Sequence, residues 1–364
     1  MKSLILPPLS ELYGAITRAR STLYQRGTFR TNRLDRPVIS VGNLTTGGTG
    51  KTPLVEWIAK VVAAEGKRVC ILTRGYGRRN PNRRVLVSDG QSVFSNPFDA
   101  GDEPYLLAKN LVGSAAVISD IDRVSAGKGA IAHLKTDCFI LDDGFQHLRL
   151  ARDLDVVTID ATNPWGGGNL LPYGRLREAP DALKRADCIV ITRSDQVENV
   201  ATLVSDLNAV SGNRPIFISR MAPRRVMKLD QSAAVEPGGP IAAFCAVGNP
   251  ESFFQLVDRS GYELVSKTKF PDHHVYSPRD LQNLETAARN AGANALITTA
   301  KDGVKLNPNS FSLPCYVMEI ELQVDNAPEL KRMIVAGVQG SGAGARGQGP
   351  VVRVRGRGLA ASDP

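Results

Sequence analysis

The stretch Pro37-Val-Ile-Ser-Val-Gly-Asn-Leu-Thr-Thr-Gly-Gly-Thr-Gly-Lys-Thr-Pro53 decides the fold. Its apolar, β-branched start at residues 38–41 predicts a buried parallel strand. A turn rich in glycine follows, and Lys51 and Thr52 then open a segment with the apolar spacing of a helix. Strand, glycine loop, Lys-Thr and helix form the layout of a P-loop, in which backbone N–H groups and the helix N-terminus bind phosphate. The pattern therefore predicts nucleotide binding.

The expected phosphate-binding residues are those of the loop and the first helical turn. They are Thr45, Thr46, Gly47, Gly48, Thr49, Gly50, Lys51 and Thr52. We expect Lys51 to reach the β- and γ-phosphates and the Thr52 hydroxyl to bind Mg²⁺. The loop departs from the common pattern, because Thr45 stands where a glycine is usual. The alternative is a tight strand-to-helix turn whose lysine faces solvent, and the Lys-Thr pair at the helix start disfavours it.

Downstream, strand patterns alternate with helix patterns as far as residue 219. This alternation predicts an α/β fold, a P-loop NTPase-like parallel sheet flanked by helices. The regularity lapses between residues 221 and 240, and a second, smaller α/β unit follows. We expect four segments: an N-terminal helix with a basic segment (1–36), a P-loop domain (37–225), a smaller C-terminal α/β domain (226–336) and a disordered Gly/Arg-rich tail (337–364).

Composition limits the kind of partner. The chain has 364 residues and a formal net charge of +9, which favours an acidic partner such as nucleic acid, an anionic membrane or a phosphorylated substrate. The five cysteines lie far apart and mostly in apolar runs, which indicates reduced core residues of a cytosolic protein and no zinc site. No apolar run approaches the ~20 residues that a membrane span needs, and no cleavable signal peptide is evident.

The N-terminal segment has two interpretations. Residues 9–24 place apolar side chains near one helical face, and arginines lie on and after this helix. Such a helix can lie in a bilayer interface with its arginines on anionic headgroups. It can equally pack onto the domain with a solvated basic flank. Spacing alone leaves both possibilities open.

Acidic residues at two positions are candidates for chemistry. Asp102 and Glu103 open a helix, where they either complement the helix dipole or supply a general base or metal-binding carboxylate. Asp142 and Asp143 end an apolar strand, which is the Walker-B arrangement that holds Mg²⁺. Because ligands bind at the carboxyl ends of strands in doubly wound sheets, we expect the second pair beside the nucleotide.

Two loops complete the candidate site. The Gly/Pro-rich loop at residues 163–178 suits a partly apolar, partly anionic substrate. In the second unit, Asp272 precedes His273 and could orient it as a base, although a plain surface loop is an equal alternative. No third ligand of suitable spacing accompanies these residues, which argues against a metal site there. Residues 299–305 form a basic turn beside this unit.

Six motifs occur in one order along the chain. They are Gly-Asn-Leu-Thr-Thr-Gly-Gly-Thr-Gly-Lys-Thr-Pro (42–53), Thr-Arg-Gly-Tyr-Gly-Arg (73–78), Gly-Asp-Glu-Pro (101–104), Leu-Asp-Asp-Gly-Phe-Gln-His (141–147), Asn-Pro-Trp-Gly…Leu-Leu-Pro…Leu-Arg-Glu (163–178) and Phe-Pro-Asp-His-His-x-Tyr (270–276). Together they resemble the tetraacyldisaccharide 4'-kinase family, the lipid A kinases of Gram-negative bacteria. The resemblance implies transfer of the γ-phosphate of ATP to the 4'-hydroxyl of tetraacyldisaccharide 1-phosphate, which gives lipid IVA.

The resemblance also implies a place and a set of residue roles. The enzyme would be peripheral on the cytoplasmic face of the bacterial inner membrane, attached through its N-terminal helix, with no nucleic acid as partner. Asp102 and His273 would deprotonate the sugar hydroxyl once the two domains close, with Asp272 orienting them and Lys51 acting on the phosphates. The implied Mg²⁺ ligands are Thr52, Asp142, Asp143 and Glu178, and Gln146 and Arg177 are implied to contact ATP.

Two rival functions follow from the same residues. A P-loop ATPase or GTPase that switches partner binding at the membrane would explain the phosphate loop and the basic N-terminus. It would leave the Asp-His-His loop without a role. An RNA-binding protein would use the Gly/Arg-rich tail, since such segments bind single strands.

Overall fold

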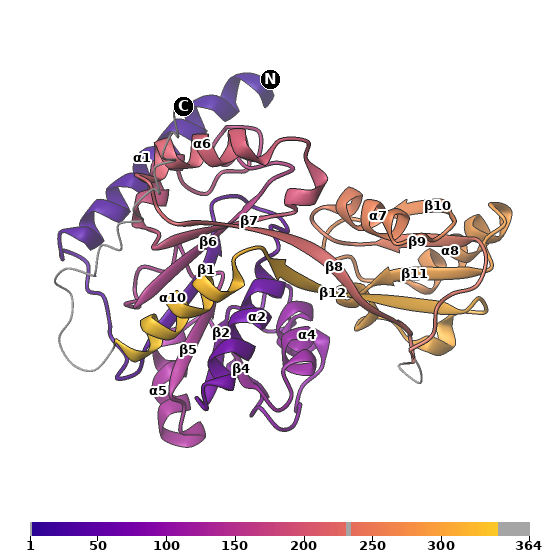
Figure 1. Ribbon diagram of the computed structural model, residues 1–364, viewed down its shortest axis with the longest axis horizontal. Coiled ribbons are helices and arrows are strands. Elements are labelled where there is room, and N and C mark those ends of the chain that lie inside the picture. The colour runs from indigo at the N-terminus through magenta and orange to yellow at the C-terminus, as the bar shows by residue number, and fades with distance from the viewer. Residues whose placement is uncertain (1, 231–233, 341–364) are drawn as a thin grey trace, which may run out of the picture.

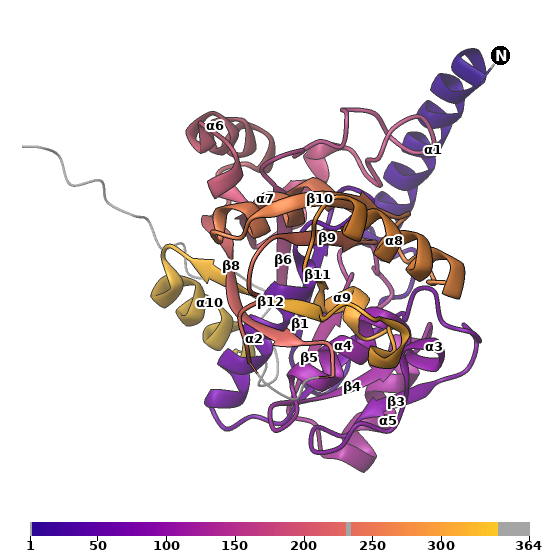
Figure 2. The same ribbon diagram turned by 90° about the vertical axis from the view of Figure 1, so that its right-hand side faces the viewer.

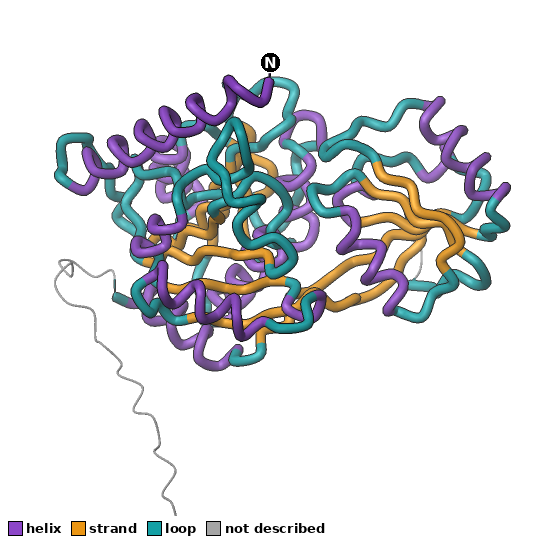
Figure 3. Tube along the Cα trace, turned by 90° about the horizontal axis from the view of Figure 1, so that it is seen from above, coloured by secondary structure: helices purple, strands orange, loops and turns teal. Residues whose placement is uncertain are grey.

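One mixed sheet runs through the residues that the computed structural model describes, 2–230 and 234–340. Its strands in chain order are β1 (Val38–Asn43), β2 (Val69–Thr73), β3 (Val85–Ser88), β4 (Ala115–Ser119), β5 (Cys138–Asp142), β6 (Leu154–Asp160), β7 (Cys188–Thr192), β8 (Ile216–Lys228), β9 (Ile241–Cys245), β10 (Leu264–Lys269), β11 (Ala295–Thr299) and β12 (Cys315–Val324). Figure 1 shows that these strands form a larger and a smaller unit, and Figure 3 shows the strands continuing from one unit into the other.

Helices flank the sheet in both units. They are α1 (Lys2–Gln25), α2 (Lys51–Ala64), α3 (Pro97–Ala100), α4 (Asp102–Asn110), α5 (Arg123–Leu134), α6 (Val200–Ser211), α7 (Pro250–Arg259), α8 (Pro278–Asn290), α9 (Ala300–Gly303) and α10 (Ala327–Gln339), with 3₁₀ turns η1 (Pro180–Arg185), η2 (Ser194–Gln196) and η3 (Pro308–Ser310). In the larger unit, α2, α4 and α10 share one hydrophobic core, whereas α5 and α6 belong to two other cores. Helices therefore cover both faces of the sheet.

The larger unit has the strand order β3-β4-β2-β5-β1-β6-β7-β8. All of these pairs are parallel except β3 with β4. Every residue of β1, β2, β5, β6 and β7 is buried, because helices lie on both faces. This burial explains why these strands are continuous apolar runs in the sequence. The carboxyl ends of the parallel strands meet at one edge, where the P-loop follows β1.

The smaller unit is the parallel set β10-β9-β11-β12. Helix α7 packs its apolar residues into one core of this unit, and α8 packs into another. Figure 2, in which this unit faces the viewer, shows the unit in front of the larger one and α1 projecting from the larger one.

Two long antiparallel strands, β8 and β12, join the units. Their pairing runs from Tyr316 opposite Lys228 to Val324 opposite Ser219. The first residues of β8 also pair with β7 in the larger unit, whereas the first residues of β12 pair with β11 in the smaller one. The connection is therefore a continuous ribbon of backbone hydrogen bonds.

The sequence analysis is confirmed for the fold class and for most strand positions. It missed β4, α5 and α10. The predicted boundary between residues 225 and 226 falls inside β8. Helix α10 packs against α2 and β1 rather than against the smaller unit to which residues 226–336 were assigned. That assignment needs correction, because the chain returns to the larger unit along β12. The predicted disordered tail lies outside the described residues from position 341 onward.

The packing of α10 gives the first testable expectation. Ile334 is fully buried among residues of α2 and the central strands. Replacing Ile334 with Ala should lower the free energy of unfolding by about 2–4 kcal/mol, because it leaves a cavity in the larger unit's core. Urea unfolding followed by tryptophan fluorescence measures this, since Trp57 and Trp165 both lie in the larger unit. The exposed Lys331→Ala is the control, and equal stabilities of the two variants would contradict this packing.

Candidate active site

The P-loop lines a cavity of about 780 Å³ between the two units. Residues 46–52 all lie on its wall. Gly50 precedes α2 with φ 77°, and a β-carbon at this position would come within 2.6 Å of Met221 Cε. The left-handed backbone conformation therefore favours glycine at this position, and a larger side chain would also displace the end of the Met221 side chain. The residues of the loop and of the first turn of α2 line the cavity, where a phosphate site needs them.

Two threonines predicted in this loop have different surroundings. The Thr49 side chain is buried, and its hydroxyl accepts a hydrogen bond from Asn43 Nδ2 at 2.9 Å and bonds with Thr158 Oγ1 at 2.9 Å. It therefore supports the loop from within. Thr45 is also buried and lines a separate cavity of about 440 Å³ on the other side of the loop. The structure does not bring Thr45 to the wall of the larger cavity.

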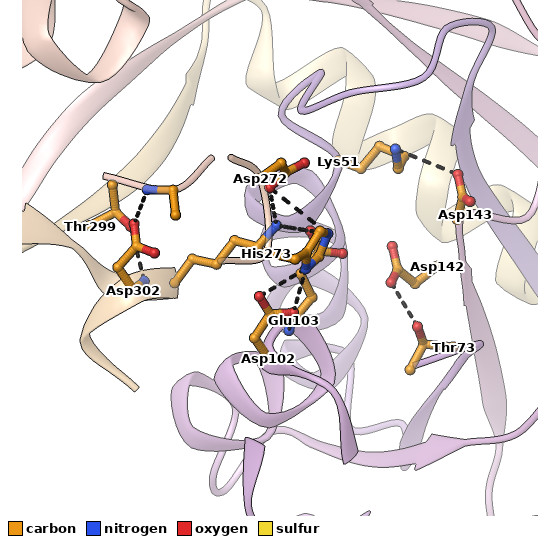
Figure 4. Close-up of polar contacts among 12 residues, drawn as sticks. Lys51, Thr73, Asp102, Glu103, Asp142, Asp143, Asp272, His273, Thr299 and Asp302 are labelled. Carbon is orange, nitrogen blue, oxygen red and sulfur yellow. Dashed lines mark hydrogen bonds and ion pairs between the residues drawn. The ribbon is translucent and has the colours of Figure 1, made fainter. Parts of the chain in front are cut away.

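Asp142 lies at the carboxyl end of β5, beside the P-loop (Figure 4). Its carboxylate accepts a 2.9 Å hydrogen bond from Thr73 Oγ1, and no ion pair involves it within residues 2–230 and 234–340. Burial, together with the charges of Glu103 and Asp143, raises its pKa to about 6. Burying a carboxylate without a cationic partner costs folding free energy, and a bound ligand can lower this cost by bringing a cation. Thr73 was not identified as a site residue, although it is the first residue of the motif Thr-Arg-Gly-Tyr-Gly-Arg (73–78).

The negative charge of Asp143, the next residue, is instead balanced by cationic side chains of the protein. Burial alone would raise its pKa, but Lys51 and Arg177 outweigh burial and hold it near 2. Lys51 Nζ lies 3.5 Å from Asp143 Oδ1, and Arg177 Nη1 donates to both carboxylate oxygens at 2.8 and 3.0 Å. The structure thus brings the P-loop lysine and the predicted phosphate-contacting arginine onto one carboxylate.

Gln146 and Glu178 line the same cavity but already have protein partners. Gln146 Nε2 donates to the Asn43 carbonyl at 2.9 Å, and Glu178 is nearly buried and pairs with Arg185 at 2.9 Å. Helix α1 reaches this end of the cavity, because Arg20 Nη2 donates to the Gln146 carbonyl at 3.1 Å. The structure therefore places the predicted N-terminal helix beside the predicted nucleotide residues.

The two units meet at Asp102 and His273 (Figure 4). Asp102 begins α4 in the larger unit, and His273 lies in the loop after β10 in the smaller one. His273 Nδ1 is 3.0 and 3.1 Å from the two carboxylate oxygens. His273 adopts the left-handed conformation, with φ 61°, which favours glycine and costs a non-glycine residue free energy. Residues 171 positions apart in the chain thus form one hydrogen-bonded pair.

Burial, hydrogen bonding and nearby charges shift the pKa of both Asp102 and His273. Burial alone would raise the pKa of Asp102, but the hydrogen bond with His273 and the charge of Lys301 outweigh it and lower that pKa. Burial alone would lower the pKa of His273, and the hydrogen bond with Asp102 outweighs it, so this pKa is raised. Asp102 is therefore a carboxylate at neutral pH.

Lys301 is a further residue at this site, which the sequence analysis treated only as part of a basic turn. Its Nζ lies 2.8 Å from Glu103 Oε1 and 3.2 Å from Asp272 Oδ1. Asp272 Oδ1 lies 3.9 Å from His273 Nε2, beyond hydrogen-bond distance, so Asp272 contacts the pair through Lys301 rather than directly. This cluster forms only where the two units pack together, because Glu103 comes from the larger unit, whereas Asp272 and Lys301 come from the smaller one.

The predicted Mg²⁺ ligands fit only in part. No three His, Cys, Asp or Glu side chains gather as a metal-binding group in the described part of the chain. Asp143 and Glu178 already have cationic partners. Asp142 and Thr52 remain, and Mg²⁺ characteristically uses one or two protein oxygens together with substrate phosphates and water. The uncompensated carboxylate of Asp142 is the observation that fits this ion.

A P-loop and a histidine held by a buried carboxylate, both at one cavity, define a P-loop phosphotransferase, an enzyme class that positions a nucleoside triphosphate against an acceptor. Comparison with known proteins gives the family. The model of the tetraacyldisaccharide-1-P 4'-kinase family matches residues 2–339. This chain belongs to that family.

Individual family members and one solved structure are similar to this chain over most of its length. A tetraacyldisaccharide 4'-kinase of Geobacter sulfurreducens is 42% identical over 330 residues, which cover 87% of this chain and 88% of that protein. One of Syntrophus aciditrophicus is 38% identical over 346 residues, 92% of each chain. The crystal structure of the apo form of LpxK from Aquifex aeolicus in complex with ATP is similar to this fold with a TM-score of 0.72 and 31% identity, over 91% of this chain and 98% of that one.

The raised pKa of Asp142 has a consequence for stability. The folded state holds the Asp142 proton more tightly than the unfolded state does, so stability falls as pH rises from about 4 to about 6 and stays lowered above that. Asp142→Asn should therefore raise the free energy of unfolding at pH 8 by on the order of 1–3 kcal/mol. The gain should shrink near pH 4.

Urea unfolding of both proteins at the two pH values measures the effect. The exposed Asp35→Asn is the matched control and should change stability little at either pH. An Asp142→Asn protein that is less stable than the wild type at pH 8 would show that the buried carboxylate is compensated by the fold itself.

Proposed function

We propose that this protein phosphorylates the 4'-hydroxyl of tetraacyldisaccharide 1-phosphate with ATP and so forms lipid IVA in lipid A biosynthesis. One observation supports this above all others: His273 lines the cavity of the P-loop and is hydrogen-bonded to the buried carboxylate of Asp102. A carboxylate–histidine pair suits deprotonation of an acceptor hydroxyl. Membership of the kinase family supplies the identity of the acceptor.

Binding of ATP would use the P-loop and the residues around it. The loop amides, Lys51 and the N-terminus of α2 supply positive charge for the phosphates. Thr52 and Asp142 would hold Mg²⁺ together with phosphate oxygens, and the bound ion would neutralise charge on the transferred group. Arg177, released from Asp143, would be free to contact a phosphate. Phosphoryl transfer needs mainly such positioning and charge neutralisation.

The cavity has two chemically different ends. One end is lined by Met221, Phe253 and Met318, among other apolar side chains, and suits a purine base. The other end is lined by Tyr13, Thr17, Arg20, Leu148 and Leu171 and lies against α1. A mixture of apolar and basic side chains suits a phosphorylated, acylated sugar.

Deprotonation of the acceptor would fall to the Asp102–His273 pair. Asp102 is ionised and holds His273, so its carboxylate has lone pairs left for a sugar hydroxyl. Because the two residues come from different units, the base would be complete only while the units are together. A nucleotide switch needs no such pair, which disfavours the rival function.

Helix α1 would attach the enzyme to the cytoplasmic face of the inner membrane. Leu9, Leu12 and Ile16 are largely exposed, with 44%, 58% and 57% of their surface accessible. Their spacing places them on one side of the helix. Among the described helices, none has the length and apolarity needed to cross a bilayer. A peripheral helix with an apolar face and nearby arginines fits this arrangement.

The function is tested by a transfer assay with γ-labelled ATP and tetraacyldisaccharide 1-phosphate. The label should reach the lipid, and Asp102→Asn should lower kcat by about 10²- to 10⁴-fold while ATP binding survives, because the base is lost and the phosphate site is not. The exposed Asp206→Asn is the matched control. Release of the label only as free phosphate would overturn the proposed function, and wild-type turnover by Asp102→Asn would overturn the role of this residue.

The role of α1 is tested by co-sedimentation with anionic lipid vesicles. Replacing Leu9, Leu12 and Ile16 together with Ser should weaken vesicle binding at least about tenfold, because each leucine or isoleucine contributes apolar surface to the bilayer. The matched control replaces the exposed Leu86, Phe94 and Phe98 with Ser, since these lie on and near β3. Equal losses in the two triple variants would contradict a membrane role specific to α1.

A further inference from the structure

Lys301 lies in the first turn of α9, and its ammonium group contacts three acidic or basic side chains. Only 15% of its side-chain surface is exposed. Its ammonium group lies 2.8 Å from Glu103 Oε1, 3.2 Å from Asp272 Oδ1 and 3.3 Å from His273 Nε2. Glu103 belongs to the larger unit, whereas the other two belong to the smaller one. Lys301 is thus a cation at the junction of the units, directly behind the Asp102–His273 pair.

The contact with His273 determines where the imidazole proton lies. A lysine ammonium group can donate hydrogen bonds but cannot accept them. His273 Nε2 must therefore accept from Lys301, which leaves Nε2 without a proton. The remaining nitrogen, Nδ1, carries the proton and donates it to Asp102, 3.0 Å away. While Nε2 accepts from Lys301, His273 is therefore a neutral imidazole with a defined tautomer, and the charge of Lys301 opposes the rise in pKa that Asp102 causes.

We propose that Lys301 is a positioning residue for the reaction, holding His273 in the neutral, Nδ1-protonated form and thereby leaving Asp102 as the base. The inference rests on the proposed function. With Nε2 occupied by Lys301, His273 has no free lone pair for a substrate proton. Asp102 takes the proton of the acceptor hydroxyl, the acceptor oxygen bonds to the γ-phosphorus of ATP, and the bond from that phosphorus to the β–γ bridging oxygen breaks, so that ADP leaves with the electron pair.

The same contacts make the base depend on closure of the two units. Lys301 is held against His273 partly by Glu103, which follows Asp102 at the start of α4. If the units separate, the pair of Asp102 with His273 and the pair of Glu103 with Lys301 break together. The backbones also touch nearby, since a β-carbon on Gly248 would lie 2.5 Å from the Gly48 nitrogen of the P-loop. Closure therefore brings the smaller unit against the phosphate loop at the same time as it completes the base.

Removal of Lys301 should change the pH dependence. The charged and titratable groups facing His273 are Asp102 from α4, Asp272 from its own loop, Lys301 from α9 and the Tyr76 ring from the loop after β2. The positive charge of Lys301 lowers the pKa of His273, while Asp102 and Asp272 raise it. Without Lys301, His273 keeps its proton to higher pH. The resulting imidazolium makes Asp102 a weaker base.

The first test compares pH profiles of kcat/KM for the wild type, Lys301→Met and Lys301→Arg. Lys301→Met should shift the acidic limb to higher pH and lower kcat by about 10- to 100-fold, within the range of acid–base effects. Lys301→Arg retains the positive charge, so the acidic limb of its pH profile should lie nearer to that of the wild type than the limb of Lys301→Met does. The exposed Lys267→Met in β10 removes a charge elsewhere in the smaller unit and is the control. An unshifted limb in Lys301→Met would overturn the inference.

The second test needs no variant. Nitrogen NMR of the full-length protein, labelled at its four histidines, distinguishes protonated from unprotonated ring nitrogens. At pH 8 with a non-hydrolysable ATP analogue, His273 should show a protonated Nδ1 and an unprotonated Nε2. A protonated Nε2 would overturn the inference even if the enzyme is active. Failure of the wild type to label the lipid would instead overturn the proposed function, and the NMR result would then still decide the tautomer.

Discussion

The hydrogen bond between Asp102 and His273 is the contact on which the arrangement of the site depends. It joins the two units across the cavity, and it is supported by the nearby pair of Glu103 and Lys301. The units can meet in this way because β8 and β12 connect them as a paired ribbon rather than as a loose linker. A ribbon of this kind fixes the direction of approach, so the loop of His273 arrives opposite the start of α4.

Electrostatics divides the site into compensated and uncompensated charges. Asp143 has Lys51 and Arg177, and Lys301 has three acidic neighbours, so these groups are stable within the protein itself. Asp142 is the exception: it is buried beside them, and within residues 2–230 and 234–340 its carboxylate has the Thr73 hydroxyl as its one hydrogen-bond donor and forms no ion pair. A site with one unpaired buried carboxylate beside a loop of inward-facing amides fits a polyanion that arrives with its own divalent cation. Under the proposed function, the unpaired carboxylate of Asp142 lowers the free energy of unfolding, and the same carboxylate is available to bind the cation that accompanies ATP.

Helix α1 links the proposed membrane attachment to the chemistry. Its exposed apolar side chains lie on one side, while Tyr13, Thr17 and Arg20 line the cavity. One helix therefore borders both the proposed bilayer surface and the proposed acceptor end of the site. In the proposed reaction, the acyl chains need not leave the membrane completely for the sugar to reach Asp102.

The sequence by itself determined the parallel sheet, the P-loop and the acids at the end of β5, because each depends on residues close together in the chain. The spacing of the glycines with Lys51 and the apolar run before Asp142 are such local signals. Resemblance to a family was needed to connect Asp102 with His273, since no local pattern joins residues so far apart. Only the tertiary structure decided that β8 and β12 form one ribbon, that α10 returns to the larger unit and that Lys301 meets His273. The physical reason is that hydrogen bonds and ion pairs between distant segments depend on how the units pack, which no short stretch of sequence encodes.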